Sequence, residues 1–461
     1  MKNNKVTKNR FLRGKKLFFT SRLKELRKRE IGILIGVQLL MFSAIYAVNI
    51  LQPCFEKIRF ERMQSFPGRF LVFFLWVILL FQIVFLIYLA YLFIKYKAIK
   101  SVADDALPSC TIIVPAYNEG ELVYQTLKSI AESDYPKDKL QIIAIDDGSK
   151  DDTWFWINKA FADLNHALII YKQPVNKGKR HALYKGFSTG TGEIFITIDS
   201  DSVIEKDTLR NLASPFVVNK NCGAVAGNVK VMNKNQGMIP RMLNVSFVFS
   251  FEFVRAAQST LGFVLCTPGA LSAYKREAVL HCLNEWMEQK FLGNPATIGE
   301  DRAMTNLILR EGYEVKFQRN ANVLTNTPIR FKNLHKMFTR WGRSNVRETF
   351  VMNRFVFKNF RETSKTGARF IFVNQWIKLI LAFPLLFLMF YFLLTHPLLY
   401  FSSALMSIFI FSSIQMLFFT KQYNFVESLW AYPYSVFYLF ALFWIFPFSI
   451  ATVKNGGWLT R

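Results

Sequence analysis

Hydrophobic residues form long uninterrupted runs near both ends of the chain and short runs in its middle. The runs 31–51 and 70–94 are each long enough to cross a bilayer as a helix. The mixed-charge stretch 53–69 between them predicts a short loop, so these runs would form a hairpin. Apolar runs return at 370–394 and 398–419, which predicts two further membrane spans.

The last apolar stretch, 425–453, contains Pro433 and Pro447. Proline removes a helical hydrogen bond, so a helix bends or breaks there. Two structures stay open for this stretch: one kinked span, or an interface helix followed by a re-entrant piece. The choice decides on which side of the membrane the C-terminal residues 458–461 lie.

The middle of the chain alternates short apolar runs with helical patterns and turn residues. The runs Cys110–Val114, Leu140–Ile145 and Glu193–Ile198 have the length and composition of buried strands, and 122–133 has a helical pattern. Strands that alternate with helices predict a parallel sheet covered on both faces. Ligands bind at the carboxyl ends of the strands in such sheets, and a polar cluster follows each of these three runs.

Composition and charge indicate a membrane protein. The chain of 461 residues has 48 phenylalanines and a formal net charge of +26. Basic residues dominate 1–30 and return at Lys95, Lys97 and Lys100, which places both ends of the hairpin in the cytoplasm. The charge lies beside apolar spans, so it predicts contact with the lipid bilayer and not with nucleic acid. Five scattered cysteines without a CxxC pair indicate a reducing compartment and no structural zinc site.

Basic and apolar residues alternate from 331 to 369, which predicts amphipathic helices in the cytoplasmic membrane interface. The basic members of this pattern are Arg340, Arg343, Arg347, Arg354, Lys358, Arg361, Lys365 and Arg369.

Two acidic residues, Asp199 and Asp201, follow the third predicted strand. Carboxylates that flank one residue can bind a hard divalent cation, which would neutralise a departing diphosphate. The alternative is an ordinary capping turn, because Asp and Ser favour turns and caps. The polar clusters at the neighbouring strand ends favour the metal site.

The two earlier strands also end in polar residues. Tyr117 and Glu119 follow the first, and Asp146 and Asp147 follow the second. Carboxylates there can accept hydrogen bonds from a base N–H or from ribose hydroxyls, and a tyrosine can stack on a base. Ordinary turns are the alternative.

A basic turn at 176–180 contains Lys177 and Lys179. Its ammonium groups could face a base or a phosphate. The alternative is a solvated run of charge.

Glu300 and Asp301 follow Gly299 at the start of a helical pattern. Asp301 is the candidate general base, because a sugar hydroxyl is a poor nucleophile until a carboxylate takes its proton. Stabilisation of the helix N-terminus is the alternative. Further on, Arg340 could bind diphosphate oxygens and Trp341 could form a platform for a sugar ring, although membrane interfaces also favour both residue types.

In chain order, these motifs resemble the membrane-embedded processive family-2 glycosyltransferases, which include hyaluronan, chitin, cellulose and poly-N-acetylglucosamine synthases. The motifs are specific as a set, and the similarity runs from the N-terminal hairpin to Arg461. Three segments are most similar to the hyaluronan and chitin synthase branch. They are Gly178-Lys179-Arg180, Gly299-Glu300-Asp301-Arg302 with Thr305-Asn306, and Trp458-Leu459-Thr460-Arg461.

The resemblance implies an α/β GT-A domain with a mixed, mostly parallel sheet, inserted between transmembrane helices. It implies inverting transfer from a UDP-sugar donor to a growing polysaccharide acceptor, with Mg²⁺ or Mn²⁺ held by Asp199 and Asp201. Asp301 would be the base, and Cys266 and Trp341 would bind the acceptor. Trp458 and Arg461 would contact the diphosphate or gate the site. The implied donor contacts are Tyr117, Glu119, Asp146, Asp147, Lys177, Lys179, Asp199 and Arg340.

Two positions depart from the family pattern. Met337 stands where glutamine belongs, and a thioether cannot replace the hydrogen bonds of an amide. Leu459 replaces a glycine in the C-terminal tetrapeptide, which leaves the role of that segment open.

The predicted parts follow one another along the chain. They are a basic cytoplasmic N-terminus 1–30, a transmembrane hairpin 31–94, a cytoplasmic GT-A domain 95–330, amphipathic interface helices 331–369, a transmembrane or re-entrant region 370–453 and a tail 454–461.

We therefore expect a multi-pass plasma-membrane enzyme that polymerises a β-linked polysaccharide from UDP-N-acetylglucosamine, with UDP-glucuronate as a possible second donor, and translocates the product. Synthesis of chitin or poly-N-acetylglucosamine is one alternative. A non-processive transferase to a lipid phosphate is another, although that class generally lacks the Arg340-Trp341 pair. A catalytically dead export channel is the non-enzyme alternative, but it would have lost a carboxylate, and Asp199, Asp201 and Asp301 are all present.

Overall fold

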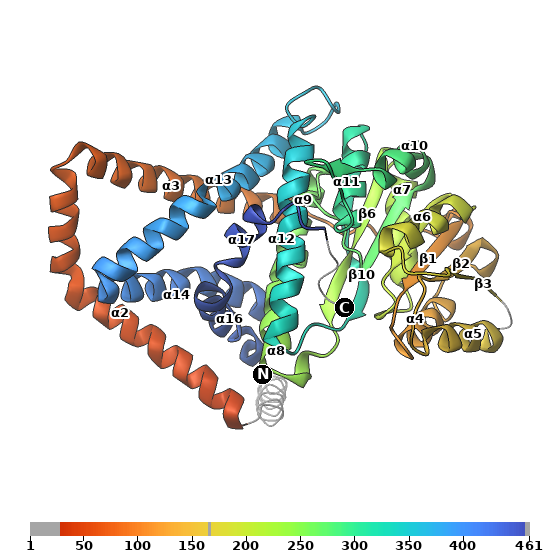
Figure 1. Ribbon diagram of the computed structural model, residues 1–461, viewed down its shortest axis with the longest axis horizontal. Coiled ribbons are helices and arrows are strands. Elements are labelled where there is room, and N and C mark those ends of the chain that lie inside the picture. The colour runs from red at the N-terminus through yellow and green to blue at the C-terminus, as the bar shows by residue number, and fades with distance from the viewer. Residues whose placement is uncertain (1–27, 165–166, 457–461) are drawn as a thin grey trace, which may run out of the picture. The chain divides into compact units, whose positions relative to one another are not determined.

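The computed structural model describes residues 28–164 and 167–456. Its contacts divide the chain into two compact units. Among the described residues, one unit contains 28–72 together with Asn235–Ser246 and Phe387–Phe443. The other contains the described residues of Phe73–Lys234, Phe247–Leu386 and 444–456. Figure 1 shows the helices and strands of both units.

An eight-stranded sheet in the order β3-β2-β1-β4-β7-β6-β10-β5 forms the centre of the second unit. β3, β2, β1 and β4 are parallel, β7 is antiparallel to β4 and β6, and β6 and β10 are parallel. The predicted mixed, mostly parallel sheet is thus confirmed. Its strands are β1 Cys110–Ala116, β2 Leu140–Asp146, β3 Leu168–Lys172, β4 Ile194–Ile198, β5 Ser202–Ile204, β6 Cys222–Val231, β7 Leu271–Lys275 and β10 Glu314–Thr325.

The strands form where the chain is rich in β-branched residues and both faces become covered. Every residue of β1 and β4 is buried, which explains why these strands are continuous apolar runs without alternation. They coincide with two of the predicted strands, and β2 coincides with the third. A separate small hairpin pairs β8 Lys290–Phe291 with β9 Asn294–Pro295.

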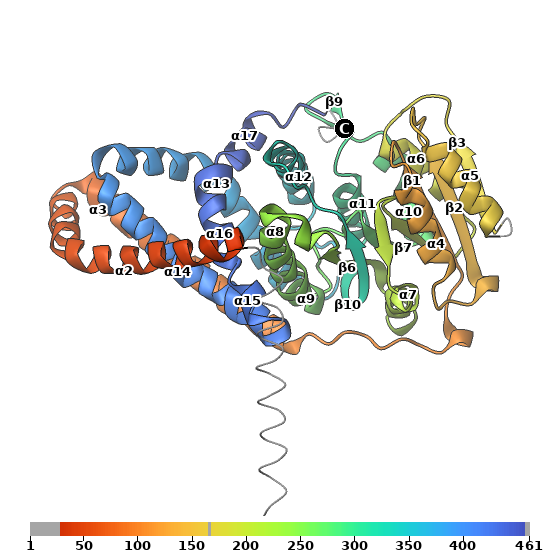
Figure 2. The same ribbon diagram turned by 90° about the horizontal axis from the view of Figure 1, so that it is seen from below.

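Helices cover both faces of the sheet. α4 and α5 contact each other, and α10 contacts both α6 and α11. The chain passes from β1 to β2 to β3 in one direction and then returns past β1 to β4. Because crossovers are right-handed, α6 lies on the face opposite α4 and α5. Figures 1 and 2 show α5 beside the edge strand β3. The helices are α4 Leu122–Ala131, α5 Thr153–Asp163, α6 Lys179–Thr189, α7 Thr208–Val218, α10 Arg276–Met287 and α11 Glu300–Arg310.

One helical stretch changes its pitch in the middle. α8 Met238–Val248 continues into a π-helical segment, η4 Phe249–Arg255, and then into α9 Ala256–Thr260. π-Helical turns are rare and often occur at functional sites. The short 3₁₀ turns are η1 Asp104–Ala106, η2 Lys137–Lys139 and η3 Lys234–Gln236.

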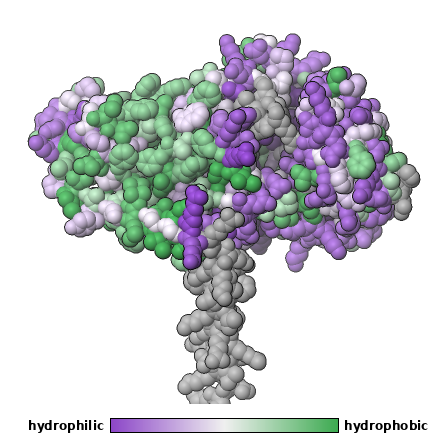
Figure 3. Space-filling model, turned by 60° about the horizontal axis from the view of Figure 1, so that its bottom comes forward, coloured by the Kyte–Doolittle hydropathy of each residue, from purple (hydrophilic) through white to green (hydrophobic). Residues whose placement is uncertain are grey.

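Four helices in the described ranges are long and apolar enough to cross a membrane, or five if one bent pair counts as a span. The four are α2 Lys28–Met63, α3 Phe66–Lys95, α13 Lys365–Thr395 and α14 Pro397–Gln422. Apolar side chains gather on the surface of the long helices, while the surface of the sheet and its covering helices is mostly hydrophilic (Figure 3). The bent stretch consists of α15 Phe425–Ser428, α16 Ala431–Phe437, η5 Tyr438–Leu442 and α17 Ile445–Ala451.

The predicted loop at 53–69 is wrong, because α2 continues through Pro53 to Met63 and α3 begins at Phe66. The charged residues of this stretch are mostly Glu, Lys and Arg, which are good helix formers. Gln52 also donates to Glu56 one turn later along α2. Mixed charge therefore indicated exposure here and not a turn.

The core of the first unit lies between α2 and α14. Met41 and Ala44 of α2 are buried against Leu405 of α14. At the start of α2, the buried Glu30 forms an ion pair with Arg241 of α8 at 3.5 Å. A buried carboxylate needs such a partner, so this pair ties two segments that lie far apart in the sequence.

The basic segment 331–369 contains one helix, α12 Phe331–Asn353, and its last residues belong to α13. Arg343 and Arg347 are buried in protein contacts, with Arg343 donating to Thr452 Oγ1 at 3.1 Å. α12 lies against α17 and α11 (Figure 1). Its place at a membrane interface stays a prediction.

Candidate active site

The loops after β1, β2 and β4 are hydrogen-bonded to one another. Asn118 has a left-handed backbone (φ 54°), which asparagine tolerates, and its N–H donates to Ser149 Oγ at 3.0 Å. Its Oδ1 accepts from the Lys150 N–H at 2.9 Å. Ser200 Oγ donates to Glu119 Oε1 at 3.2 Å. The polar clusters predicted at the strand ends thus meet at one edge of the sheet.

The two aspartates after β2 have different surroundings. Both carboxylate oxygens of Asp147 accept backbone N–H groups, from Lys177 at 2.9 Å and Gly178 at 2.8 Å. Burial raises the pKa of Asp147 despite these hydrogen bonds. Asp146 accepts from the Ser149 N–H through Oδ1, while its buried Oδ2 has no hydrogen-bond partner among the described residues. Asp147 therefore holds the basic turn in place, and Asp146 has an oxygen to spare for a ligand N–H.

Lys179 connects the end of β4 to the start of α11. Its Nζ lies 2.5 Å from Asp199 Oδ1 and 3.2 Å from Glu300 Oε1. Burial alone would lower the pKa of Lys179, but the charges of Asp199 and Glu300 raise it. The ammonium group is therefore held between two carboxylates, whereas the Lys177 side chain is exposed.

The acidic pair begins α11 behind a left-handed glycine, Gly299 (φ 70°). Asp301 Oδ2 accepts from the Gly269 N–H at 3.1 Å, and Oδ1 accepts from the Arg302 N–H at 2.7 Å. Burial and the neighbouring charge of Glu300 raise the pKa of Asp301. Burial would also raise the pKa of Glu300, but Lys179, a backbone hydrogen bond and the charges of Arg340 and Arg180 together outweigh it, so the net direction is downward. The pair thus combines an ionised Glu300 with an Asp301 that accepts a proton more readily.

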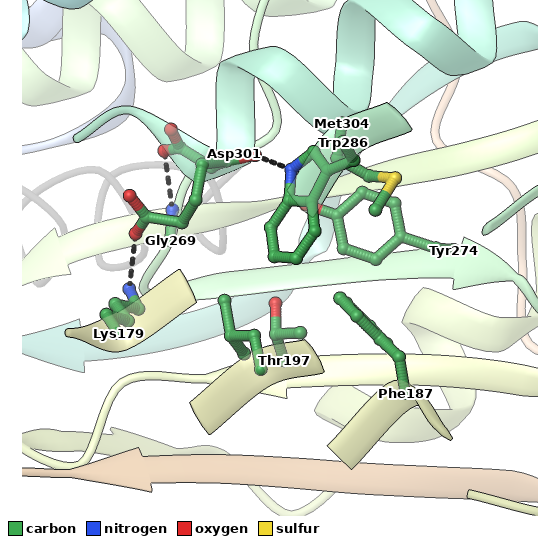
Figure 4. Close-up of a pocket in the computed structure, with 10 residues that line it drawn as sticks. Lys179, Phe187, Thr197, Gly269, Tyr274, Trp286, Asp301 and Met304 are labelled. Atoms are coloured by element: carbon green, nitrogen blue, oxygen red, sulfur yellow. Dashed lines mark hydrogen bonds and ion pairs between the residues drawn. The ribbon is translucent and has the colours of Figure 1, made fainter. Parts of the chain in front are cut away.

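Figure 4 shows the pocket that contains this cluster. The Lys179 ammonium and the Gly269 N–H point toward the two carboxylates, and the Trp286 indole N–H donates to the Glu300 carbonyl oxygen at 2.8 Å. An apolar wall keeps the carboxylates partly out of water. It is formed by Leu183, Phe187, Tyr274, Trp286 and Met304.

Cys266 lies beside the candidate base, with its Sγ 3.8 Å from Asp301 Oδ2. Burial raises the pKa of the Cys266 thiol to about 12, and the charge of Asp301 adds to this shift. Arg255, the last residue of η4, donates to the Cys266 carbonyl oxygen at 3.3 Å. The thiol therefore stays protonated and acts as a small neutral group at the edge of the site.

α12 brings the predicted Arg340 and Trp341 to the same unit. The positive charge of Arg340 helps to lower the pKa of Glu300, so this arginine lies close enough to act on the acidic pair. The Trp341 ring is 43% exposed and lies against Phe338, with ring centroids 5.6 Å apart. Met337 is buried, so the thioether occupies an apolar position where glutamine would need hydrogen-bond partners.

The structure brings most of the predicted site residues to one region of the second unit. Tyr117, Glu119 and Asp146 lie at or just after the strand ends. Asp301 lines the pocket, Cys266 contacts Asp301, and Asp199 pairs with Lys179, which also lines the pocket. Asp201 is half-buried next to Asp199 and accepts a hydrogen bond from Ser202 Oγ at 3.3 Å. The predicted Trp458 and Arg461 lie outside the described residues.

The sequence did not indicate two residues that hold the start of α11 in place. Trp286 donates to the Glu300 carbonyl oxygen, and Glu348 accepts from Asn306. Trp286 and Glu348 belong to no recognised strand-end motif. Glu348 was one charge in a basic stretch, and only its spacing of seven residues from Trp341 could have indicated a shared helix face.

A substitution of Gly299 tests how tightly this turn is built. Alanine at a left-handed position costs about 1–2 kcal/mol, and here its Cβ would lie 1.9 Å from Ser344 Oγ. We expect Gly299→Ala to lower the thermal unfolding midpoint and the activity. Gly293→Ala is the matched control, because Gly293 also has a positive φ (84°) but open space around the added Cβ. Equal midpoints for the two variants would contradict the close contact with Ser344.

The comparisons with known proteins identify the family. The family model named Glycosyl transferase family 2 matches residues 111–283. An N-acetylglucosaminyltransferase of Azorhizobium caulinodans is 31% identical over 275 residues, which cover 58% of this chain and 69% of that relative. The chain belongs to glycosyl transferase family 2.

The matches of this family-2 chain to other relatives cover a smaller share of those relatives. A hyaluronan synthase of Streptococcus pyogenes is 32% identical over 252 residues, which cover 54% of this chain and 59% of that synthase. A solved mannosyltransferase from Pyrobaculum calidifontis, in complex with GDP-Man and Mn²⁺, matches with a TM-score of 0.53 at 20% identity. The match covers 82% of this chain and 95% of the mannosyltransferase. The two proteins therefore share a fold of the GT-A type.

The residues of this family-2 site suit a divalent cation that also binds phosphate. In the described part of the chain, no three His, Cys, Asp or Glu side chains gather to hold a metal on their own. Mg²⁺, however, is usually bound by one or two carboxylates together with substrate phosphates and water. Asp199 and Asp201 at the strand end offer such a donor set, so the two residues fit a metal that arrives with a nucleotide.

Proposed function

We propose that this protein transfers sugar from a UDP-sugar donor to the end of a growing polysaccharide, with inversion at the anomeric carbon. The observation that supports this most is the cluster at the start of α11. Asp301 there has a raised pKa, and Lys179 lies between Asp199 and Glu300. A base for a hydroxyl and charges for a diphosphate are the two things that such a transfer needs. Membership of glycosyl transferase family 2 also supports sugar transfer.

Residues at the strand ends would bind the donor. Asp146 has a buried oxygen that could accept an N–H of the base, and Tyr117 could stack on it. Asp147 would act indirectly by holding the turn that carries Lys177 and Lys179. Asp199 and Asp201 would hold Mg²⁺ or Mn²⁺, which when bound would neutralise the departing diphosphate. Arg340 would stabilise the same charge from α12.

Asp301 would take the proton from the acceptor hydroxyl. Its position is fixed by two backbone N–H groups, and its raised pKa increases its ability to accept a proton near neutral pH. Cys266, next to this carboxylate, and the exposed face of Trp341 would bind the terminal sugars of the acceptor. Aromatic faces stack on sugar rings without fixing their register, so a chain could slide after each addition.

The substrate and the location are inferred from the relatives and from the helices. Relatives with the printed names hyaluronan synthase and N-acetylglucosaminyltransferase favour UDP-N-acetylglucosamine, with UDP-glucuronate as a possible second donor. The four helices of the described ranges that are able to span a membrane favour a multi-pass protein of the cell membrane. We infer that the sheet domain faces the cytoplasm, and that the polymer leaves on the other side through the same protein.

Sealed membrane vesicles that carry the full chain with its catalytic domain outward would test this function. UDP-N-acetylglucosamine and UDP-glucuronate are added outside, singly and together, with Mg²⁺ or Mn²⁺. We expect polymer inside the vesicles, protected from added hyaluronidase or chitinase until detergent opens them. Digestion by one of the two enzymes then identifies the polymer.

Other outcomes would reject parts of the proposal. Product that extracts into organic solvent as a single lipid-linked sugar would indicate the non-processive alternative. Polymer found only outside the vesicles would contradict export by the same chain. No transfer from either UDP-sugar, added singly or together, would reject the proposed donors.

A further inference from the structure

α12 carries a second row of polar residues on the same face as the predicted diphosphate and acceptor contacts. Arg347 lies seven residues after Arg340, and Glu348 lies seven residues after Trp341. Seven residues are close to two helical turns, so each pair lies on nearly the same line along the helix. Whatever fixes Arg347 and Glu348 therefore also fixes the direction in which Arg340 and Trp341 point.

The first contact of this row is with the turn before the acidic pair. Arg347 is 4% exposed, and its Nη2 donates to the carbonyl oxygen of Ile298. Its Nε donates to Glu348 Oε1 at 2.9 Å. Ser344 lies so close to Gly299 that a side chain there would overlap it. α12 is thus in direct contact with the backbone from which Glu300 and Asp301 project.

The second contact is with α11 itself. Asn306 Nδ2 donates to Glu348 Oε2 at 2.8 Å and to the Glu348 carbonyl oxygen at 3.0 Å. One turn closer to Asp301, Arg302 Nη1 donates to Asn345 Oδ1 at 2.8 Å. Two adjacent turns of α11 are therefore hydrogen-bonded to two adjacent turns of α12.

A third route runs from Glu348 to the backbone of the acidic pair through α10. Gln289 Nε2 donates to Glu348 Oε1 at 3.0 Å, and Gln289 Oε1 accepts from Arg180 at 3.3 Å. Arg180 lies over the Trp286 ring, 4.9 Å from its centroid. Trp286 in turn donates to the Glu300 carbonyl oxygen. Glu348 thus joins α11 and α12 directly, and it reaches Trp286 of α10 through Gln289, which follows that helix, and Arg180 of α6.

We propose that Glu348 is a positioning residue that keeps Arg340 and Trp341 of α12 in register with the base Asp301 of α11. The carboxylate is 1% exposed and receives donors from three side chains, Asn306, Gln289 and Arg347. A buried carboxylate whose oxygens are all hydrogen-bonded is held rigidly. Removing the carboxylate leaves its three donors unpaired. This inference rests on the proposed glycosyl transfer.

The test is Glu348→Gln in the full chain, purified in detergent. Glutamine keeps the length of the side chain. It replaces one accepting oxygen with an NH₂ group, which cannot accept from the surrounding donors. We expect kcat for polymer formation to fall on the order of 10- to 100-fold, since a shift of about 1 Å at a transfer site has that effect. The KM for UDP-N-acetylglucosamine and the Kd for UDP should change less than about threefold, because the strand-end loops would supply most donor contacts. Glu362→Gln, which removes an exposed carboxylate, is the matched control and should leave kcat unchanged.

A double-variant cycle separates positioning from general stability. Arg340→Lys keeps a charge, so its activity should stay measurable. If Glu348 acts through Arg340, the double variant Glu348→Gln/Arg340→Lys is little slower than the slower single variant. Multiplicative losses, or a wild-type kcat in Glu348→Gln, would overturn the proposal. Asn345→Ala breaks the half-buried contact with Arg302 in the same α11–α12 interface. If Glu348→Gln does not fold, a loss of kcat in Asn345→Ala supports the coupling of the two helices, and a wild-type kcat in it overturns the proposal.

Backbone hydrogen exchange decides the question without any activity. Glu348→Gln, or Asn345→Ala in its place, should speed exchange both at 299–303 and at 339–343, and Glu362→Gln should not. Unchanged exchange at either segment would overturn the proposal. A wild-type protein without transfer activity would reject the proposed function, whereas the exchange result would still decide whether the two helices are joined through Glu348.

Discussion

Replacing Asp301 with asparagine should reduce sugar transfer on the order of 10²- to 10⁴-fold, the usual range for loss of a general base. Asparagine has the size and shape of aspartate but cannot accept a proton. The variant should bind UDP as the wild type does, because the residues expected to bind the base and ribose lie on the loops after β1 and β2. Calorimetric UDP binding and polymer formation from radiolabelled donor measure the two properties separately.

The surroundings of Asp301 also predict a pH dependence. The base must be ionised to take a proton, and burial together with Glu300 raises its pKa. Transfer should therefore rise with pH through a range above that of a free carboxyl group. This limb should disappear from the residual activity of Asp301→Asn.

Asp138→Asn is the matched control. Asp138 is exposed, and its substitution removes the same charge from the same domain. If Asp301→Asn polymerises at nearly the wild-type rate, Asp301 only stabilises the N-terminus of α11. If it also loses UDP binding, the substitution has disturbed the pocket, and the loss of transfer could not be assigned to the base.

Replacing Asp201 with asparagine should abolish transfer that depends on a divalent cation, the second large effect that we expect. Asp201 is half-buried at the end of β4, so losing one carboxylate oxygen removes a proposed metal ligand without opening the core. UDP binding to the wild type should strengthen when Mg²⁺ or Mn²⁺ is added. In Asp201→Asn that strengthening should be lost, and excess EDTA should bring the wild type to the same state.

The same Asp138→Asn control applies here, and its metal dependence should match that of the wild type. Full activity of Asp201→Asn, or of the wild type in excess EDTA, would reject the metal assignment. An unchanged thermal midpoint in Asp201→Asn would confirm that the effect lies in the site.

Local patterns were enough to predict the frame of the fold. β1, β2 and β4 are runs of β-branched residues buried on both faces, and no other element accommodates such runs as well. The carboxyl ends of parallel strands share one edge, so the polar clusters after these strands had to lie near each other. The helical pattern after Gly299 predicted a helix that begins at Asp301, one residue after the start of α11 at Glu300.

Charge alone did not indicate which residues are buried. Arg343, Arg347 and Glu348 were part of a basic stretch that predicted an interface helix, and all three are buried. Each is satisfied by partners that lie far away in the sequence, as Glu348 is by Asn306 and Gln289. A one-dimensional pattern shows how often charges recur but not whether a distant segment brings a hydrogen-bond partner.

What the sequence by itself determined is the set of elements and the edge of the sheet where chemistry gathers, because local propensity and strand geometry decide both. Only the tertiary structure decided what each polar side chain does there. Asp147 holds a turn through two backbone N–H groups, and Lys179 lies between Asp199 and Glu300. These roles depend on distances between segments, and burial makes such distances decisive because an unpaired polar group inside a protein is costly.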